Sequence, residues 1–257
     1  MRTRYEAEID GIPLSSVSSS IFVTDIQEAA PNVYRSTVNY PVGDGQRILR
    51  TVRQSLRVTV TFEIHDRRIR NRADVCERVQ KWAKGRILKV NYRPDQRLRV
   101  ICETQPTVAS ALKWTDSLVV VFSTLAVPFW EDALPTRITA LGDGGMSAYV
   151  RGTAQNALVE ATVANTGNET ITAATLRAGD STIAFSGISI PPGGNLALAY
   201  DDERVLSAKI GATSVLAKRT VSSDDDLIVP CGQKVAFSVS ETGAGAKTTF
   251  SVRGCYL

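Results

Sequence analysis

Residues 56–64 read LRVTVTFEI, and this stretch decides the fold of the first half of the chain. Side chains of an extended strand point alternately to its two faces. One face here carries only apolar residues, which are Leu56, Val58, Val60, Phe62 and Ile64. Polar side chains fill the other face, so the stretch is predicted to be a strand with one face buried.

A helix with one apolar side is predicted after this strand. Its apolar residues fall within an arc of about 120° at helical pitch, and they are Val75, Cys76, Val79, Trp82 and Ala83. Asn71 is placed to cap the start of the helix, and Gly85 is placed to end it. Strands are predicted next over residues 87–92, 98–102 and 118–125, so the single helix has a sheet to pack on.

Two hairpins are predicted before the deciding strand. Asp10-Gly11 is a tight-turn signal between short apolar runs, and it predicts an opening hairpin. A serine-rich loop at 15–20 and a strand from residue 21 follow. Residues 34–49 have sparse apolar positions and the turn Gly43-Asp44-Gly45 near their middle, so they predict a second, protruding hairpin.

The candidate interface residues lie in the second hairpin and directly after it, and they are Asp44, Arg47, Arg50 and Arg53. The arginines continue from the turn at a spacing of three residues. On a protruding arm they could contact a neighbouring subunit, whereas as a solvated surface they need no partner. The sequence leaves both interpretations open.

The amino-acid composition of the sequence changes after residue 132. Small residues replace charged ones, no further amphipathic helix is predicted, and strand-like runs alternate with turn clusters. The runs are 158–164, 171–176, 182–185, 195–200, 205–210, 214–217, 234–239 and 248–252. We therefore expect a mainly β (α+β) protein of two domains: a sheet or barrel-like domain with one packed helix over 1–132, a linker over 133–145, and an all-β sandwich over 146–257.

Composition excludes several functional classes. The chain has 257 residues, is 43% hydrophobic, and has no apolar run near the length of a membrane span. Residues 1–132 carry 20 Lys and Arg against 15 Asp and Glu, but these charges alternate along the predicted elements, so a solvated surface is favoured over nucleic-acid binding. No secretory signal begins the chain, which predicts a cytoplasmic product unless it leaves in a larger particle.

Catalytic and metal-binding patterns are also weak. The single histidine, His65, follows a strand and is expected to be an exposed turn residue rather than a general base. The four cysteines lack C-x-x-C spacing, and a Cys231–Cys255 disulfide is not favoured in a cytoplasmic product. The acidic runs 201–203 and 224–226 could bind calcium, but solvated turns are the favoured interpretation. No enzyme activity, metal or cofactor is predicted.

A family resemblance rests on the order and spacing of several pieces. These are VTVTFEI at 58–64, the helix ending in VQKWA at 79–83, Trp114, VVVF at 119–122 and VPFW at 127–130. Together with Ile9-Asp10-Gly11 they resemble the N-terminal domain of the distal tail proteins (Dit) of long-tailed bacteriophages. Residues 252–257, VRGCYL, are similar to the last strand of tail proteins that carry a β-sandwich after this domain.

The resemblance implies a structural role in the virion. Members of the family form a ring, usually a hexamer, at the tail tip; their N-terminal domains close the ring, and galectin-like sandwiches point outward. The ring joins the tail tube protein to the tail hub protein and to receptor-binding components, and DNA passes through its lumen without specific binding. The resemblance thus implies a virion protein assembled in the host cytoplasm.

Two other functions remain as alternatives. Tail-tube subunits also combine a sheet with one helix, but the ending at 128–130 favours the distal tail interpretation. A carbohydrate-binding host-recognition module would need an exposed aromatic side chain on the sandwich. Most aromatic residues after residue 132 are predicted to point inward, so a sugar platform is not favoured.

Overall fold

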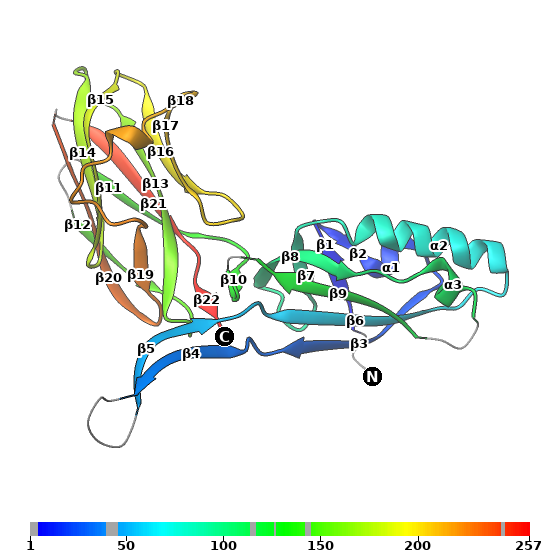
Figure 1. The fold of residues 1–257 in the computed structure, drawn as a ribbon. Coiled ribbons are helices and arrows are strands. Elements are labelled where there is room, and N and C mark those ends of the chain that lie inside the picture. Colours follow the sequence, from blue (N-terminus) through cyan, green and yellow to red (C-terminus); the bar gives the residue numbers. More distant parts are fainter. Residues whose placement is uncertain (1–4, 40–45, 114–116, 126, 142–144, 243–244) are drawn as a thin grey trace. The chain divides into compact units, whose positions relative to one another are not determined.

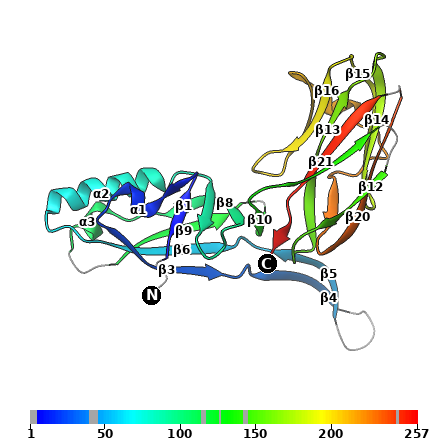
Figure 2. The same cartoon turned by 180° about the vertical axis from the view of Figure 1, so that it is seen from behind.

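The computed structural model describes residues 5–39, 46–113, 117–125, 127–141, 145–242 and 245–257. The chain forms two compact units, Met1–Trp130 and Glu131–Leu257. Figures 1 and 2 show the elements of each unit from opposite sides.

An antiparallel sheet is the frame of the first unit. Its strand order is β2-β1-β7-β8-β9-β6-β3, an open path with β2 and β3 at its edges. The strands are β1 (Ala7–Ile9), β2 (Ile12–Pro13), β3 (Ile21–Ala29), β6 (Arg57–Ile64), β7 (Ile87–Val90), β8 (Gln96–Thr104) and β9 (Leu118–Thr124). β6 lies between β9 and β3, and its alternate residues Val58, Val60 and Phe62 are fully buried. This confirms the strand with one buried face that the alternation at 56–64 predicted.

The helix α2 (Ile69–Trp82) packs on this sheet through its apolar side. Trp82 is 7% exposed, and its ring lies edge-on to Phe122 of β9 with ring centroids 5.9 Å apart. Its indole Nε1 donates a hydrogen bond to the carbonyl of Ile12, 2.7 Å away. The prediction of one amphipathic helix on a sheet is confirmed.

The predicted cap of this helix is wrong. The helix begins at Ile69, so Asn71 lies inside the first turn and donates its side-chain amide to Asp66. Asp66 also accepts from the backbone N–H of Arg68, and this bond, followed by the one from Asn71, lowers the pKa of Asp66. Asp66 therefore satisfies one free N–H at the helix start, that of Arg68, while the first turn has no side-chain cap.

Two single-turn helices were not predicted. α1 (Leu14–Val17) replaces the start of the expected loop at 15–20, and it buries Leu14. α3 (Val108–Ala111) is held by the buried Arg72 of α2, whose guanidinium donates to the carbonyls of Ala111 and Leu112 at 3.1 and 2.5 Å. Helices this short have no readable hydrophobic period, so the sequence pattern does not reveal them. Among the described helices, none combines the length and apolar character needed to cross a bilayer.

The second unit is a sandwich of two sheets. One sheet has the order β11-β21-β13-β16-β17-β18, with β19 also paired to β13, and the other has the order β12-β20-β14-β15. The first contains β11 (Thr136–Leu141), β13 (Asn156–Asn165), β16 (Asn195–Tyr200), β17 (Leu206–Ile210), β18 (Thr213–Ser214), β19 (Ile228–Pro230) and β21 (Ala246–Val252). The second contains β12 (Gly145–Val150), β14 (Ile171–Ala178), β15 (Ser181–Ile190) and β20 (Gln233–Glu241).

The core of the sandwich lies between its two sheets. Phe237 of β20 and Phe250 of β21 are fully buried, and their ring centroids are 5.4 Å apart. These strands belong to different sheets, so the contact joins the two layers. The mainly β (α+β) class predicted from the sequence is confirmed.

The linker predicted over 133–145 is wrong. Residues Thr136–Leu141 form β11, which pairs antiparallel with β21 from Thr136↔Val252 to Leu141↔Lys247. The prediction failed because β11 is a short edge strand with few large apolar residues, while its pairing partner lies more than a hundred residues later. The run expected at 214–217 is also mostly not a strand, because η1 (Leu216–Lys218) follows the two-residue β18.

Candidate functional site

The candidate site is the hairpin of β4 (Val33–Asn39) and β5 (Gln46–Arg53), which we call the arm. These strands form a two-stranded sheet of their own, and Figure 1 shows it running on from β3 and β6. At its base, the backbone N–H of Gln54 donates to the carbonyl of Asn32 at 2.8 Å. A hairpin with no third strand is marginally stable in water, so further contacts would stabilise it. The protruding hairpin predicted from the sequence is confirmed.

Large apolar side chains of the arm face solvent. The most exposed are Tyr34 (62%), Leu49 (58%), Ile48 (53%), Val38 (50%) and Val33 (46%). Single exposed apolar residues are ordinary, but here Tyr34 and Val38 share one face of the hairpin while Val33 and Ile48 share the other, so both faces carry exposed apolar surface. The outer edges of the two strands add unpaired backbone groups that another strand could meet.

A β-bulge decides which arginines of the arm share a face. Ser36 pairs with Arg50 while the next residue of β4 pairs with Ile48, so Leu49 is the extra residue. Arg47 and Arg50 are three residues apart and would lie on opposite faces of a regular strand. The extra residue places Arg47 and Arg50 on the same face of the hairpin. Tyr34 of β4 lies on that face as well.

Arg53 lies apart from this pair. It is paired with Val33, on the face opposite to Arg47 and Arg50. Its guanidinium lies 5.8 Å from the centroid of the Phe129 ring, a cation–π distance within the first unit. Among the described residues, Arg47 and Arg50 have no ion-pair partner. The structure therefore distinguishes these two arginines from Arg53, which already contacts Phe129. The fourth candidate, Asp44, lies outside the described residues.

A carboxylate anchors the strand that leads into the arm. Glu28, near the end of β3, accepts hydrogen bonds from Tyr92 Oη at 2.7 Å, from Arg93 Nε and Nη2 at 3.1 Å each, and from Trp130 Nε1 at 3.0 Å. The Arg93 guanidinium also lies 5.2 Å from the Trp130 ring centroid. Burial, followed by the hydrogen bond to Glu28, raises the pKa of Tyr92.

Trp130 is fully buried in this cluster, so its ring fills core. Trp114 lies outside the described residues. The sequence did not reveal the Glu28 cluster, because its members are separated by up to 102 positions.

His65 lies at the surface, as predicted. Its side chain is 53% exposed, its Nε2 lies 2.7 Å from Glu63 Oε2, and its ring stacks at a tilt on Phe22 with centroids 4.6 Å apart. A catalytic triad would require a nucleophile at the imidazole, whereas the contacts here are with Glu63 of β6 and Phe22 of the edge strand β3.

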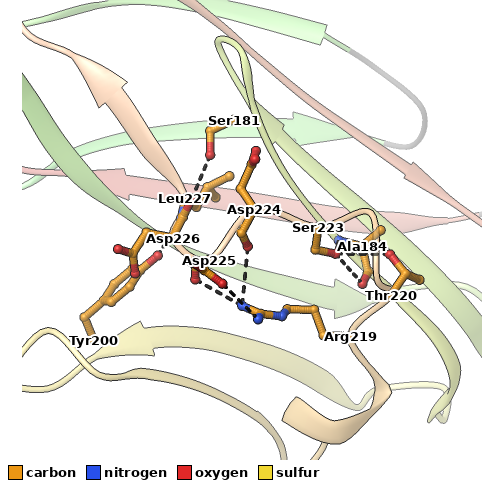
Figure 3. A network of polar contacts seen from close by, with 10 residues as sticks. All are labelled: Ser181, Ala184, Tyr200, Arg219, Thr220, Ser223, Asp224, Asp225, Asp226 and Leu227. Atoms are coloured by element: carbon orange, nitrogen blue, oxygen red, sulfur yellow. Dashed lines mark hydrogen bonds and ion pairs between the residues drawn. The ribbon is translucent and has the colours of Figure 1, made fainter. Parts of the chain in front are cut away.

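The acidic runs of the sandwich are engaged by backbone and arginine groups, as Figure 3 shows for the second run. Asp224 accepts from the backbone N–H of Thr182 at 2.7 Å, and Asp225 lies 3.3 Å from an Arg219 nitrogen. Within the described part of the chain, no group of three His, Cys, Asp or Glu side chains could hold a metal ion. The Asp225 side chain is 99% exposed, so the second run lies at a solvated turn.

The segment 219–227 begins alongside β15, where the backbone N–H groups of Thr220 and Asp224 donate to the carbonyls of Ala184 and Thr182 at 2.8 Å each, and further contacts hold it (Figure 3). Ser223 exchanges hydrogen bonds with the backbone of Ala184 at 2.9 and 3.1 Å, and the Tyr200 hydroxyl accepts from the backbone N–H of Leu227 at 2.6 Å. Val221 is fully exposed, and it lies between Thr220 and Ser223, which are both hydrogen-bonded to Ala184.

Aromatic side chains of the sandwich point mostly inward, as predicted. Phe185, Tyr200, Phe237 and Phe250 are each 8% exposed or less. Tyr149 is 59% exposed, and its hydroxyl donates to the carbonyl of Gly232 at 3.0 Å. One exposed tyrosine does not make the stacked platform that sugar-binding sites use.

Comparisons with solved structures identify the fold. The crystal structure of the Dit protein of phage SPP1, described as a paradigm of the hub adsorption apparatus in phages that infect Gram-positive bacteria, matches with a TM-score of 0.66. The match covers 98% of this chain and 99% of that one, at 9% sequence identity. The fold is therefore shared across both units.

Baseplate structures of phage p2 also match. A chain of the baseplate in its activated conformation with Sr matches at a TM-score of 0.52 and 10% identity, over 97% of both chains. A chain of the same baseplate with Ca matches at 0.52 and 9%, over 99% of this chain and 98% of that one. No protein-family model and no curated protein sequence matches this chain. The resemblance to distal tail proteins stated from the sequence is thus confirmed at the level of the fold.

Proposed function

We propose that this chain is a structural protein of a phage tail tip, and that copies of it assemble into a hexameric ring. The ring joins the tail tube protein to the tail hub protein and to receptor-binding components, and DNA crosses its lumen without specific binding. The observation that carries this proposal is the Dit-like fold over 98% of the chain. The role is non-enzymatic, and the protein acts in the virion after assembly in the host cytoplasm.

The arm supports the proposal as the contact between neighbouring copies. Its exposed Tyr34 and Val38 would lose contact with water against a second subunit, at about 25 cal/mol for each Å² of apolar surface removed. Arg47 and Arg50 on the same face supply charge that fixes orientation more than affinity. A head-to-tail contact that closes on itself produces a ring.

The direct test is the oligomeric state of the purified chain. Native mass spectrometry and electron microscopy are expected to give a hexamer with a central hole for the unmodified protein. A variant with both Arg47→Glu and Arg50→Glu is expected to be monomeric. The reversed charges of the arm would then repel the surface of the neighbouring copy that the two arginines attract.

The matched control is Arg137→Glu with Lys247→Glu, two exposed residues on the paired strands β11 and β21 of the sandwich. This control changes the net charge equally and is expected to keep the ring. Rings that persist in the arm variant would remove the arm from the interface. An unmodified chain that stays monomeric at high concentration, with and without the tail tube protein, would overturn the ring itself.

The sugar-binding alternative is less well supported. It would require ligand stacking on Tyr149, the one strongly exposed aromatic side chain of the described sandwich. A glycan array probed with the full-length chain separates the two functions, since binding that is lost in Tyr149→Ala would favour host recognition.

A further inference from the structure

Two cysteines far apart in the sequence are held beside the same segment of the sandwich. Cys255 begins β22 (Cys255–Tyr256), and its carbonyl accepts from the backbone N–H groups of Thr153 and Ala154 at 2.9 Å each. Cys231 follows β19, and its backbone N–H donates to the carbonyl of Gln155 at 3.3 Å. The segment 152–155 therefore holds both cysteines by their backbones.

A glycine allows the close approach of the last strand. Gly152 has a φ of +120° and forms a parallel bridge with Cys255. A Cβ at position 152 would lie 2.2 Å from the carbonyl oxygen of Cys255 and 2.7 Å from its nitrogen, which is too close for any side chain. The backbone N–H of Gly232, the residue after Cys231, donates to the carbonyl of Val150 at 2.8 Å. This bond holds Cys231 beside the same stretch of chain that contacts Cys255.

The two thiols lie close enough for each to shift the pKa of the other, and the two shifts have opposite directions. The hydrogen bond from Cys255 is the main cause that lowers the pKa of Cys231 to about 7, against burial and the nearby Asp132, which raise it. The same contact, burial, and the charges of Glu131 and Asp132 raise the pKa of Cys255. Cys231 is partly exposed while Cys255 is 4% exposed. One thiol is thus an accessible nucleophile near neutral pH, and the other keeps its proton beside it.

We propose that Cys231 and Cys255 form a reactive dithiol, which a small-molecule disulfide converts into an intramolecular disulfide bond. The Cys231 thiolate attacks one sulfur of the small disulfide and expels its first thiolate, leaving a mixed disulfide on Cys231. Cys255 then gives up its proton and attacks the Cys231 sulfur, expelling the second thiolate. The protein loses two protons and two electrons, and the small disulfide becomes two thiols.

The bond would tie the turn before β20 to the last strand of the chain. It closes the segment 231–255, which contains β20 and β21, one central strand from each sheet of the sandwich. Closing this loop restricts the unfolded chain and so raises the stability of the sandwich. This inference does not depend on the proposed role in the tail.

The experiment treats the reduced full-length protein with oxidised glutathione at pH 7.5, under native conditions. Intact mass spectrometry is expected to show the loss of two hydrogen atoms, and peptide mapping is expected to find Cys231 joined to Cys255. The midpoint of thermal unfolding of the sandwich is expected to rise by several degrees in the oxidised form and to return when a reductant is added.

Single-cysteine variants separate the two steps. Cys255→Ser is expected to stop at the mixed disulfide, with glutathione retained on Cys231, while Cys231→Ser reacts at least ten times more slowly at position 255. Cys102→Ser, in the first unit, is the matched control and is expected to form the bond at the unmodified rate. The proposal is overturned if the native protein keeps four free thiols after treatment, or if the mapped bond joins any other pair.

Discussion

At the scale of the residue, Trp82 joins the helix α2 to the sheet by two separate contacts. Its ring fills the space beside Phe122, and its indole N–H satisfies the carbonyl of Ile12. We expect Trp82→Phe to lower the free energy of unfolding of the first unit by about 1–2 kcal/mol, since it keeps most of the ring but leaves that carbonyl without its donor. Trp82→Ala should cost about 3–5 kcal/mol because it opens a cavity.

Urea unfolding followed by circular dichroism measures both values. Ile69→Ala is the control on the same helix, because Ile69 is 61% exposed and its change should stay within about 0.5 kcal/mol. Equal losses from Trp82→Ala and Ile69→Ala would mean that the helix does not pack through Trp82.

Tyr200 makes the stability of the sandwich depend on pH in the alkaline range. Burial raises the pKa of Tyr200 from 10.0 to about 12, although the bond from Leu227 works in the opposite direction. The folded state therefore keeps a proton that the unfolded state loses above pH 10, and this contribution to stability is present below pH 10 and is lost as the pH rises to about 12. We expect unfolding free energy to fall by about 2 kcal/mol across that range from this group.

Tyr200→Phe should remove this part of the pH dependence. The variant is expected to be less stable at neutral pH by about 1–2 kcal/mol, because the Leu227 N–H loses its acceptor. Its stability should then fall less steeply than that of the unmodified chain between pH 10 and 12. Tyr149→Phe, at an exposed position, serves as the control, and the prediction fails if both variants show the same slope.

At the scale of the element, Glu28 fixes the end of β3 from which the arm continues. It receives four donated hydrogen bonds from the turn after β7 and from Trp130, and a carboxylate accepts such bonds more strongly than a neutral amide. Glu28→Gln removes the charge at nearly constant size, so we expect a loss of about 1–3 kcal/mol in unfolding free energy.

Glu8→Gln is the matched control for this change. Glu8 pairs with Lys89 at 3.6 Å, and both side chains are about a third exposed or more. Such a surface pair contributes little, so the control should lose less than about 0.5 kcal/mol. A larger loss for Glu8→Gln than for Glu28→Gln, measured by thermal unfolding, would contradict the role given to the cluster.

Elements with a strong local signal were predictable from the sequence. The alternation of 56–64 and the apolar arc of the helix each record one buried face, and a side chain's burial follows directly from that period. β11 and the single-turn helix α1 gave no such signal, because their formation depends on partners elsewhere in the fold. Asp66 could not be predicted as an acceptor for a similar reason. Its hydrogen bond with the backbone N–H of Arg68 follows only once the residue that starts the helix is known.

The candidate site was predictable only in part. Glycines around residue 44 and the sparse apolar pattern indicated a hairpin, and the structure has one. The sequence could not separate Arg53 from Arg47 and Arg50, since the bulge at Leu49 and the contact with Phe129 both depend on the strand register. A single extra residue in one strand reverses which side chains share a face.

At the scale of the whole molecule, the two compact units each have their own hydrophobic core. We expect calorimetry to resolve two unfolding transitions, because each unit is large enough to unfold as a cooperative block. Trp82→Ala should lower only one transition, and Phe250→Ala, which costs about 3–5 kcal/mol, should lower only the other. A single transition shifted equally by both substitutions would show that the chain unfolds as one block.

Val221 has a practical consequence for engineering. Its side chain is fully exposed, while Thr220 before it and Ser223 after it are both hydrogen-bonded to the backbone of Ala184 in β15. Lengthening a connection whose ends are already fixed costs little entropy. The position is therefore a permissive graft point, where an epitope or affinity peptide can be displayed with both of its ends anchored and the sandwich core left intact.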